Sequence, residues 1–405
     1  GMTIPIAIFI GIYMQFLRPG RIKEGTVIGV ALTLLAVVLG PAVQASPTLA
    51  PLFTISAKGI SIALIIYGFV AAALPVWLLL APRDYLSTYM KIGTIGALAI
   101  GIIIVGPTVQ MPAITQFCAG GGPVITGPVL PYIFITIACG AVSGFHSLVS
   151  SGTSSKTLDK EQDSVFVGYG SMCVESVLGV VSLVIACAAA SNGHVASGTP
   201  FQIFSGAVAG FFTMFGLSQT AAACIMTMCV SALALTTLDA VGRIGRMSFQ
   251  ELFSVDEGQE MNTIQKICVN KYFATVITLF FGFLLCLGGY MNIWPLFGSA
   301  NQLLSAMVLI CLTVFLKTTG RKSFMLYIPM VVMFCVTMTA LVESAYALII
   351  KIASGNWSLL IEGLQFVLAI ALMVLAISIV YHCGKELVHA DKKTAHHDAQ
   401  PTATH

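Results

Sequence analysis

One apolar stretch of the sequence carries polar residues that could bind a solute or move a proton. Residues 134–156 begin like a membrane-spanning helix, and then place His146 among glycines and serines at Gly140, Ser143, Gly144, Ser147 and Ser150. Polar groups at membrane depth are costly unless they face a cavity or a partner, so they indicate function. Glycines allow such a helix to break, and a break frees backbone groups to hold a substrate or ion. We interpret the stretch as one wall of a transport site.

Three further candidates are among the residues that carry polar side chains into predicted spans. Glu175 lies about a third of the way into its helix, and a carboxyl group at that depth can exchange a proton. We take Glu175 as the preferred coupling carboxyl. Asn301 and Gln302 bring side-chain amides into the membrane, where they either bridge helices or hydrogen-bond a polar substrate. The alternative for Glu175, as for a lone buried histidine, is a hydrogen bond that only joins two helices.

A third set of candidates lies where predicted spans end. Pro75 interrupts one span, and Pro82 is predicted to end it. Arg83 and Asp84 follow at the boundary, as a gate-side ion pair or as a solvated helix end. Asp239 closes another span after two threonines, and we group it with the coupling or gating candidates.

The composition sets the class of protein. Apolar residues make up 57% of the chain, charged residues 9%, and the mean hydropathy is +0.96, whereas soluble domains carry about 25% charged residues. The sequence therefore predicts an all-α polytopic membrane protein embedded in the lipid bilayer. A net charge of +3 does not suggest a nucleic-acid partner. The eleven cysteines are scattered without a C-x-x-C pair, so we predict no metal site and no cofactor.

About 20 apolar residues are needed to cross a membrane, and basic residues favour the cytoplasmic side. All Lys and Arg except Lys58 and Lys351 fall in alternate loops, which predicts a cytoplasmic carboxyl terminus. The domain prediction is a transmembrane domain over 1–384 and a disordered cytoplasmic tail over 385–405. Residues 204–217 are short and glycine-rich, and we interpret them as re-entrant or interfacial. The eleven predicted spans are 3–16, 25–44, 60–81, 92–107, 128–150, 165–190, 219–239, 272–290, 295–316, 324–350 and 358–383.

Several of these clusters occur in the same order in a known family. The matching segments are 74–87, 91–94, 134–146, 150–153, 169–170, 175–176, 235–239, 294–298 and 301–302. Over roughly residues 3–316 the chain resembles the carbon starvation protein A family of bacterial inner-membrane transporters. The last two spans are similar only in hydropathy. The family pattern has an amino-terminal section before Met2, so we expect this chain to be a short form that begins partway into a larger protein.

The resemblance implies uptake of small organic nutrients, peptides or pyruvate, driven by a cation gradient. It also implies an inverted-repeat fold of the amino acid/polyamine/organocation type. The leading hypothesis is a secondary active transporter in the bacterial cytoplasmic membrane, coupled to protons in preference to sodium. A second hypothesis is a membrane sensor or structural partner that needs no solute pathway. An intramembrane enzyme is disfavoured, because no Gly-x-Ser-x-Gly or His-Glu-x-x-His pattern is present.

Overall fold

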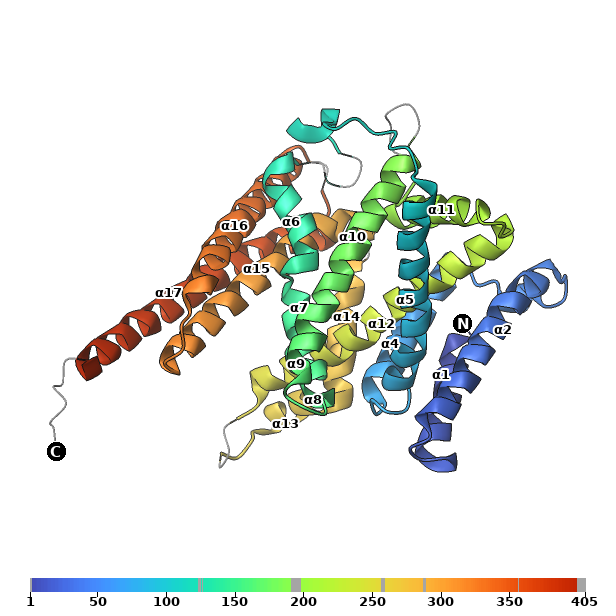
Figure 1. Cartoon of the computed structure of the whole chain (residues 1–405). Helices are drawn as coiled ribbons and strands as arrows, with labels where there is room; N and C mark the ends of the chain where they lie inside the picture. The colour runs from blue at the N-terminus through green and yellow to red at the C-terminus, as the bar shows by residue number, and fades with distance from the viewer. Residues whose placement is uncertain are drawn as a thin grey trace. The chain divides into compact units, whose positions relative to one another are not determined.

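The computed structural model describes residues 2–122, 125, 127–190, 198–255, 259–286, 289–355 and 357–398 (Figure 1). Over these residues every regular element is a helix and none is a strand, which confirms the predicted all-α class. The α-helices are α1 (Thr3–Ile12), α2 (Ile22–Ala45), α3 (Ala50–Phe53), α4 (Ala57–Ala73), α5 (Leu80–Val105), α6 (Val129–Ala141), α7 (Gly144–Val149), α8 (Ser155–Thr157), α9 (Asp163–Val165), α10 (Ser171–Ala188), α11 (Pro200–Thr213), α12 (Gln219–Phe253), α13 (Thr263–Val269), α14 (Lys271–Cys286), α15 (Tyr290–Thr318), α16 (Phe324–Ala353) and α17 (Leu364–Asp398). The described residues also form a short 3₁₀ helix, η2 (Gln116–Ala119), and the π-helical turns η1 (Tyr13–Leu17), η3 (Ser150–Ser154), η4 (Phe166–Gly170) and η5 (Leu359–Gly363).

Seven helices in the described part of the chain are long and apolar enough to cross a membrane. The bent pair α13 and α14 adds an eighth if it counts as one span. Thr3–Leu17 and Gly59–Ala73 are apolar but shorter, and the predicted span 128–150 is divided between α6 and α7. Together these account for each of the eleven predicted segments, although only seven or eight reach spanning length as helices.

The boundary between the third and fourth predicted spans is wrong. The sequence predicts one helix over 60–81 and a loop over 82–91, but α4 ends at Ala73 and α5 begins at Leu80. Pro75 follows the end of α4, as expected of a residue that cannot continue a helix. Pro82 begins the next helix instead of ending the previous one, because proline is tolerated in a first turn where its missing N–H has no partner to lose. Arg83 and Asp84 are therefore helical residues.

Two smaller expectations concern other segments. The predicted re-entrant segment 204–217 is largely the 14-residue helix α11, which is below the length needed to cross a membrane. The tail was expected to be disordered from residue 385, but α17 continues through Asp398. Lys and Ala, which supply five of the fourteen residues of 385–398, are good helix formers and require no burial. Residues 399–405 lie outside the described part of the chain.

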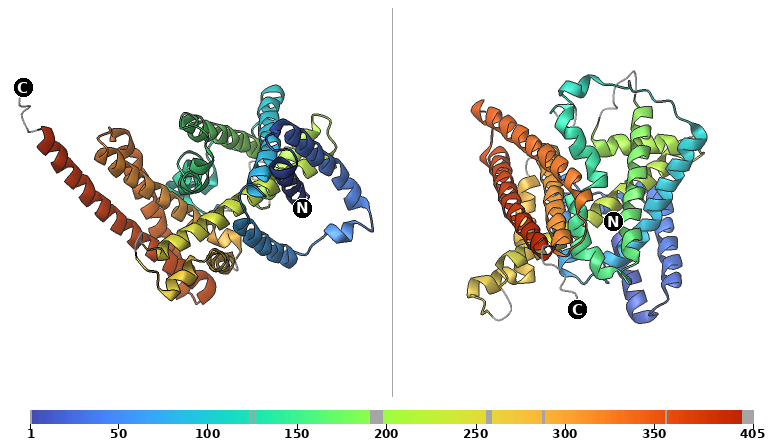
Figure 2. Two further views of the ribbon diagram at one scale, coloured as in Figure 1. Left: turned by 90° about the horizontal axis from the view of Figure 1, so that it is seen from below. Right: turned by 60° about the vertical axis from the view of Figure 1, so that its left-hand side comes forward.

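The chain divides into two compact units. Unit 1 comprises Gly1–Ala113 and Val177–Phe283. In it α12 lies against α4, α5 and α11, and Figure 2 shows α12 as the long yellow-green helix. Small residues bring α12 and α4 together: a side chain at Gly242 would meet Gly68 and Ala72 at 3.7 and 3.6 Å. Such close contacts are typical of helix pairs in lipid, where packing replaces the hydrophobic drive.

Unit 2 comprises Ile114–Ser176 and Leu284–His405. Its central element is α15, which contacts α6, α7, α16 and α17; α16 and α17 run beside it in Figures 1 and 2. The core includes Leu303, Leu341 and Ala369, each fully buried. This packing holds one face of α15 against α16 and α17 and leaves another face for α6 and α7.

Candidate functional site

The stretch predicted to break does break, and it does so inside unit 2. α6 ends at Ala141, and α7 begins at Gly144 after Ser143, whose φ of −116° and ψ of 138° are those of extended chain. Gly144 lies directly against α15. A β-carbon at this position would be 2.3 Å from the Asn301 carbonyl oxygen and 2.6 Å from the Leu304 β-carbon. Only glycine therefore permits α7 to approach α15 this closely.

The side-chain amide of Asn301 holds the broken ends in place. Its Oδ1 accepts hydrogen bonds from the Phe145 backbone N–H at 2.7 Å and from the Ser143 hydroxyl at 3.2 Å. Its Nδ2 lies 2.9 Å from Ser143 Oγ. Gln302, fully buried, donates to the Ile135 carbonyl of α6 at 3.1 Å. Of the two predicted roles for these amides, the structure shows helix bridging; a substrate contact stays a prediction.

His146 and Glu175 form an ion pair beside this break, with 3.1 Å between Nε2 and Oε2. Both side chains are about half exposed, at 45% and 41%. Gly140 faces the same carboxylate, since a β-carbon there would lie 3.9 Å from Glu175 Oε1. Four of the predicted residues, Gly140, Ser143, Gly144 and His146, are thus brought together with Glu175 and Asn301.

The two remaining serines of this stretch do not join the cluster through side-chain bonds. The Ser147 hydroxyl donates to the Gly144 carbonyl at 2.6 Å within its own helix. Ser150 opens η3 and is exposed. Their predicted contact with substrate or ion is not tested by these positions.

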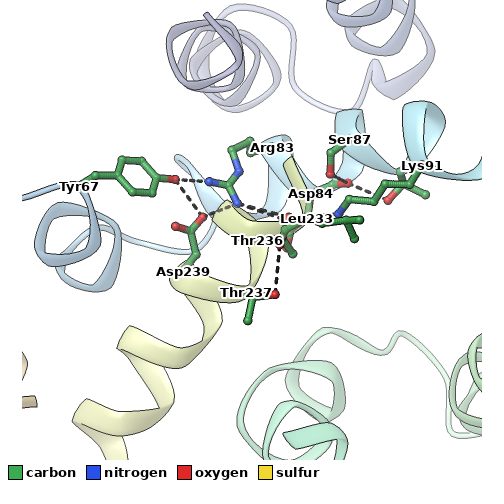
Figure 3. A network of polar contacts seen from close by, with 10 residues as sticks. Tyr67, Arg83, Asp84, Ser87, Lys91, Leu233, Thr236, Thr237 and Asp239 are labelled. Atoms are coloured by element: carbon green, nitrogen blue, oxygen red, sulfur yellow. Dashed lines mark hydrogen bonds and ion pairs between the residues drawn. The ribbon is translucent and has the colours of Figure 1, made fainter. Parts of the chain in front are cut away.

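A second polar cluster lies in unit 1, where α4, α5 and α12 meet (Figure 3). Arg83 Nη2 lies 2.9 Å from Asp239 Oδ2, and both side chains are buried, with 3% and 0% exposed. The Tyr67 hydroxyl donates to the same oxygen at 3.1 Å and accepts a hydrogen bond from Arg83 Nη1. The guanidinium therefore joins one side chain from each neighbouring helix.

The cluster continues along α5. The Thr236 hydroxyl donates to Asp84 Oδ1 at 2.9 Å and accepts from Lys91 Nζ at 3.1 Å. Asp84 Oδ1 lies 3.7 Å from the Arg83 guanidinium. The predicted Arg83–Asp84 pair is therefore present, but the closer partner of Arg83 is Asp239.

The sequence reasoning missed Tyr67, Lys91 and Thr236 as members of this cluster. Lys91 was placed in a loop because the start of α5 was misassigned. The signal that could have found it is the spacing on α5, since Asp84, Ser87 and Lys91 follow one another at intervals of three and four residues and so share one helix face.

Two further arginines of α12 bond to the open end of α4. Arg243 Nη2 donates to the Leu74 carbonyl at 2.8 Å and to the Ala71 carbonyl at 3.2 Å. Arg246 Nη1 donates to the Ala72 carbonyl at 2.8 Å. The last carbonyls of a helix have no partner within it, so these guanidinium groups satisfy the end of α4 where Pro75 prevents its continuation.

Among the described residues, no group of three or more His, Cys, Asp or Glu side chains is placed to hold a metal ion. The side chains of the two clusters offer ion pairs, amides and hydroxyls. These groups can bind a small polar solute and exchange protons.

Comparison with known proteins places this architecture in a family. The sequence profile of carbon starvation protein CstA matches residues 1–197 and 188–340. The chain is 38% identical to the peptide transporter CstA of Campylobacter jejuni, over 80% of this chain and 54% of that protein. It is 37% identical to the peptide transporter CstA of Escherichia coli, over 87% of this chain and 57% of that protein.

A relative with a different name matches a shorter region. The pyruvate/proton symporter BtsT of Escherichia coli is 50% identical over 49% of this chain and 28% of that protein. No solved structure gives a significant match. The chain spans about half the length of the CstA relatives it matches. By the profile match and by this identity, the chain belongs to the carbon starvation protein CstA family of multi-pass membrane proteins.

Proposed function

We propose that this protein takes up small organic nutrients, either peptides or pyruvate-like carboxylates, by secondary active transport. Support comes from relatives named as a peptide transporter and a pyruvate/proton symporter, and from the apolar helices that place the chain in a membrane. Uptake would be coupled to a cation, preferably the proton, and would serve the cell during carbon starvation. We place the protein in the bacterial cytoplasmic membrane with its carboxyl terminus inside, on the distribution of Lys and Arg.

The observation that carries this proposal is the ion pair His146–Glu175 beside the break between α6 and α7. Polar residues that only join helices are expected to be buried, as Ser143 and Gln302 are. The ion pair is instead about half exposed. Charged groups at membrane depth face a water-filled cavity in preference to lipid, so an exposed pair next to a broken helix is typical of a solute or ion pathway.

The same pair provides the coupling group. An unperturbed histidine has a pKa of about 6.5. A carboxylate 3.1 Å away, as Glu175 is, can share the proton of the imidazole. Loading and release of one proton on the histidine would change the net charge of the pair between neutral and negative. We assign Glu175 as the coupling carboxyl and His146 as its partner.

Uptake of labelled pyruvate and labelled dialanine by cells that produce this chain tests the proposal. We expect accumulation that collapses with a protonophore, persists without sodium and is faster at external pH 6 than at pH 8. Glu175→Gln should retain pyruvate entry down its gradient and lose the pH dependence. The matched control is Glu362→Gln, which alters an ion pair of the same unit at the α16–α17 turn.

Two outcomes would contradict this account. Uptake that requires sodium and is unaffected by Glu175→Gln would remove the coupling assignment. Absence of uptake for both solutes, with the protein present in the membrane, would favour a sensor or structural role.

A further inference from the structure

The cluster around Arg83 in unit 1 is neutral as a set but incompletely bonded. Arg83 and Lys91 are balanced by Asp84 and Asp239. Arg83 Nε and Asp239 Oδ1 are both buried and have no hydrogen-bond partner. A buried polar atom without a partner destabilises the fold, because it has lost its hydrogen bonds to water and gained none. Two such atoms in one ion pair indicate that the pairing seen here is not the only arrangement that the site is built for.

Arg83 also lines a small cavity between α1, α2, α5 and α12. Its other polar lining comes from the hydroxyls of Thr3, Thr33 and Ser87, and the rest is apolar. No carboxylate lines it. A guanidinium with hydroxyl groups in an apolar wall is suited to an anion, because arginine presents two parallel donors to a carboxylate. The cavity volume is about 20 Å³, room for roughly one water molecule, so the site is closed around the ion pair.

We propose that Arg83 binds the carboxylate of the transported solute, and that this carboxylate replaces Asp239 on the guanidinium. The inference rests on the proposed function and names the residue that recognises the solute. The exchange leaves the number of carboxylates paired with the Arg83 guanidinium unchanged, since one carboxylate takes the place of another. It also explains the unbonded Nε, which becomes a second donor to the incoming carboxylate.

Asp239 cannot remain a buried, unpaired anion, because a buried charge that has lost its partner is strongly destabilising. It therefore takes one proton from the aqueous side, forming a carboxyl O–H bond as the ion pair with Arg83 is broken. The solute brings one negative charge and the proton one positive charge, so the site stays neutral. The charged and titratable groups around Asp239 are Tyr67 from α4, Arg83, Asp84 and Lys91 from α5, and Arg243 from its own helix.

Asp239 and Glu175 then act in different steps. Asp239 makes solute binding depend on pH, whereas Glu175 makes net uptake depend on pH. The competing explanation is a purely structural lock, in which the Arg83–Asp239 pair only ties α5 to α12. A lock predicts that its variants lose stability regardless of the solute present.

The test measures binding to the purified chain in detergent, with pyruvate as probe and pyruvamide as its uncharged counterpart. For the unaltered protein we expect pyruvate affinity to fall about tenfold per pH unit above neutrality, as expected when one proton accompanies each solute. Asp239→Asn mimics the protonated carboxyl and removes the closer of the two carboxylates that pair with Arg83. It should bind pyruvate at least tenfold more tightly at pH 8 than the unaltered protein does, without dependence on pH, and should be stabilised against heating by pyruvate but not by pyruvamide.

A double variant guards against misfolding. Arg83→Gln with Asp239→Asn removes both charges and leaves no buried unpaired ion, so it should fold and lose the preference for pyruvate over pyruvamide. Arg246→Gln, which removes an arginine bonded to the Ala72 carbonyl and not to the cavity, should keep that preference.

The inference is overturned if Asp239→Asn binds pyruvate no better than pyruvamide, or if the double variant keeps its preference for the anion. If dialanine shows the binding and pyruvate does not, the comparison is repeated with dialanine amide under the same expectations. Failure of the unaltered protein to bind or take up either solute would instead remove the proposed function itself, and this assignment with it.

Discussion

Gly144→Ala tests whether the contact between α7 and α15 holds the broken helix in its observed position. The added β-carbon would lie 2.3 Å from the Asn301 carbonyl oxygen and 2.6 Å from the Leu304 β-carbon. The first of these is a backbone atom of α15 and cannot turn aside as a side chain could. The two helices must therefore separate by about 1 Å to restore ordinary van der Waals contact, near 3.5 Å.

The cost can be estimated from two effects. Overpacking of a buried contact costs about 1–3 kcal/mol. The separation also lengthens the bond of 2.7 Å from the Phe145 N–H to Asn301 Oδ1, and a hydrogen bond of this kind contributes about 0.5–1.5 kcal/mol. Gly144→Ala should then lower the free energy of unfolding by about 2–4 kcal/mol in total.

The assay is reversible unfolding in detergent, compared with Gly93→Ala as the matched control. Gly93 lies inside α5 and a β-carbon there would meet no atom within 4 Å. Its replacement should be neutral or stabilising by up to about 1 kcal/mol, since alanine is the better helix former. If Gly144→Ala is as stable as Gly93→Ala, then α7 does not pack on α15 as described.

Three further predictions follow from other contacts. Asn301→Leu removes the acceptor for the Phe145 N–H and the partner of the Ser143 hydroxyl, so it should lower the free energy of unfolding in detergent by about 2–3 kcal/mol. Asn270→Leu, at an exposed helix start, should lower it by less. Glu362→Ala removes bonds to Lys351 Nζ at 2.7 Å and to the Ser358 N–H at 2.8 Å, and a loss of about 1–2 kcal/mol is expected in the same assay. Arg243→Met leaves the Leu74 and Ala71 carbonyls unbonded, so hydrogen exchange at the end of α4 should rise by at least tenfold, which an unchanged exchange rate would disprove.

Most of the fold could be predicted from the lengths of the apolar segments and from the polar residues that interrupt them. Each of the eleven predicted segments contains a helix, because runs of apolar residues are a direct consequence of the membrane as solvent. The position of the break between α6 and α7 was also readable, since Ser143 and Gly144 interrupt an otherwise apolar helix. The start of α5 was not, because Pro82 reads equally as the end of one helix and the first turn of the next.

Which polar residues pair with one another was much harder to predict from the sequence. Asn301 and Ser143 are 158 residues apart, and nothing local in either segment specifies the other. Arg83 was paired with its neighbour Asp84 on proximity in sequence, whereas the structure gives it Asp239, which lies on a different helix and is its closer partner. Long-range partners depend on how helices pack, and a single sequence records only that each buried polar group needs one.

The most direct measurement of the central claim is proton movement coupled to solute in liposomes that contain only this purified chain. An inward gradient of pyruvate or dialanine is imposed without a pH gradient or sodium, and a trapped dye reports the internal pH. The account predicts acidification of the interior that requires the solute, is absent with pyruvamide and is reduced in Glu175→Gln. Solute entry without any change in internal pH would contradict it.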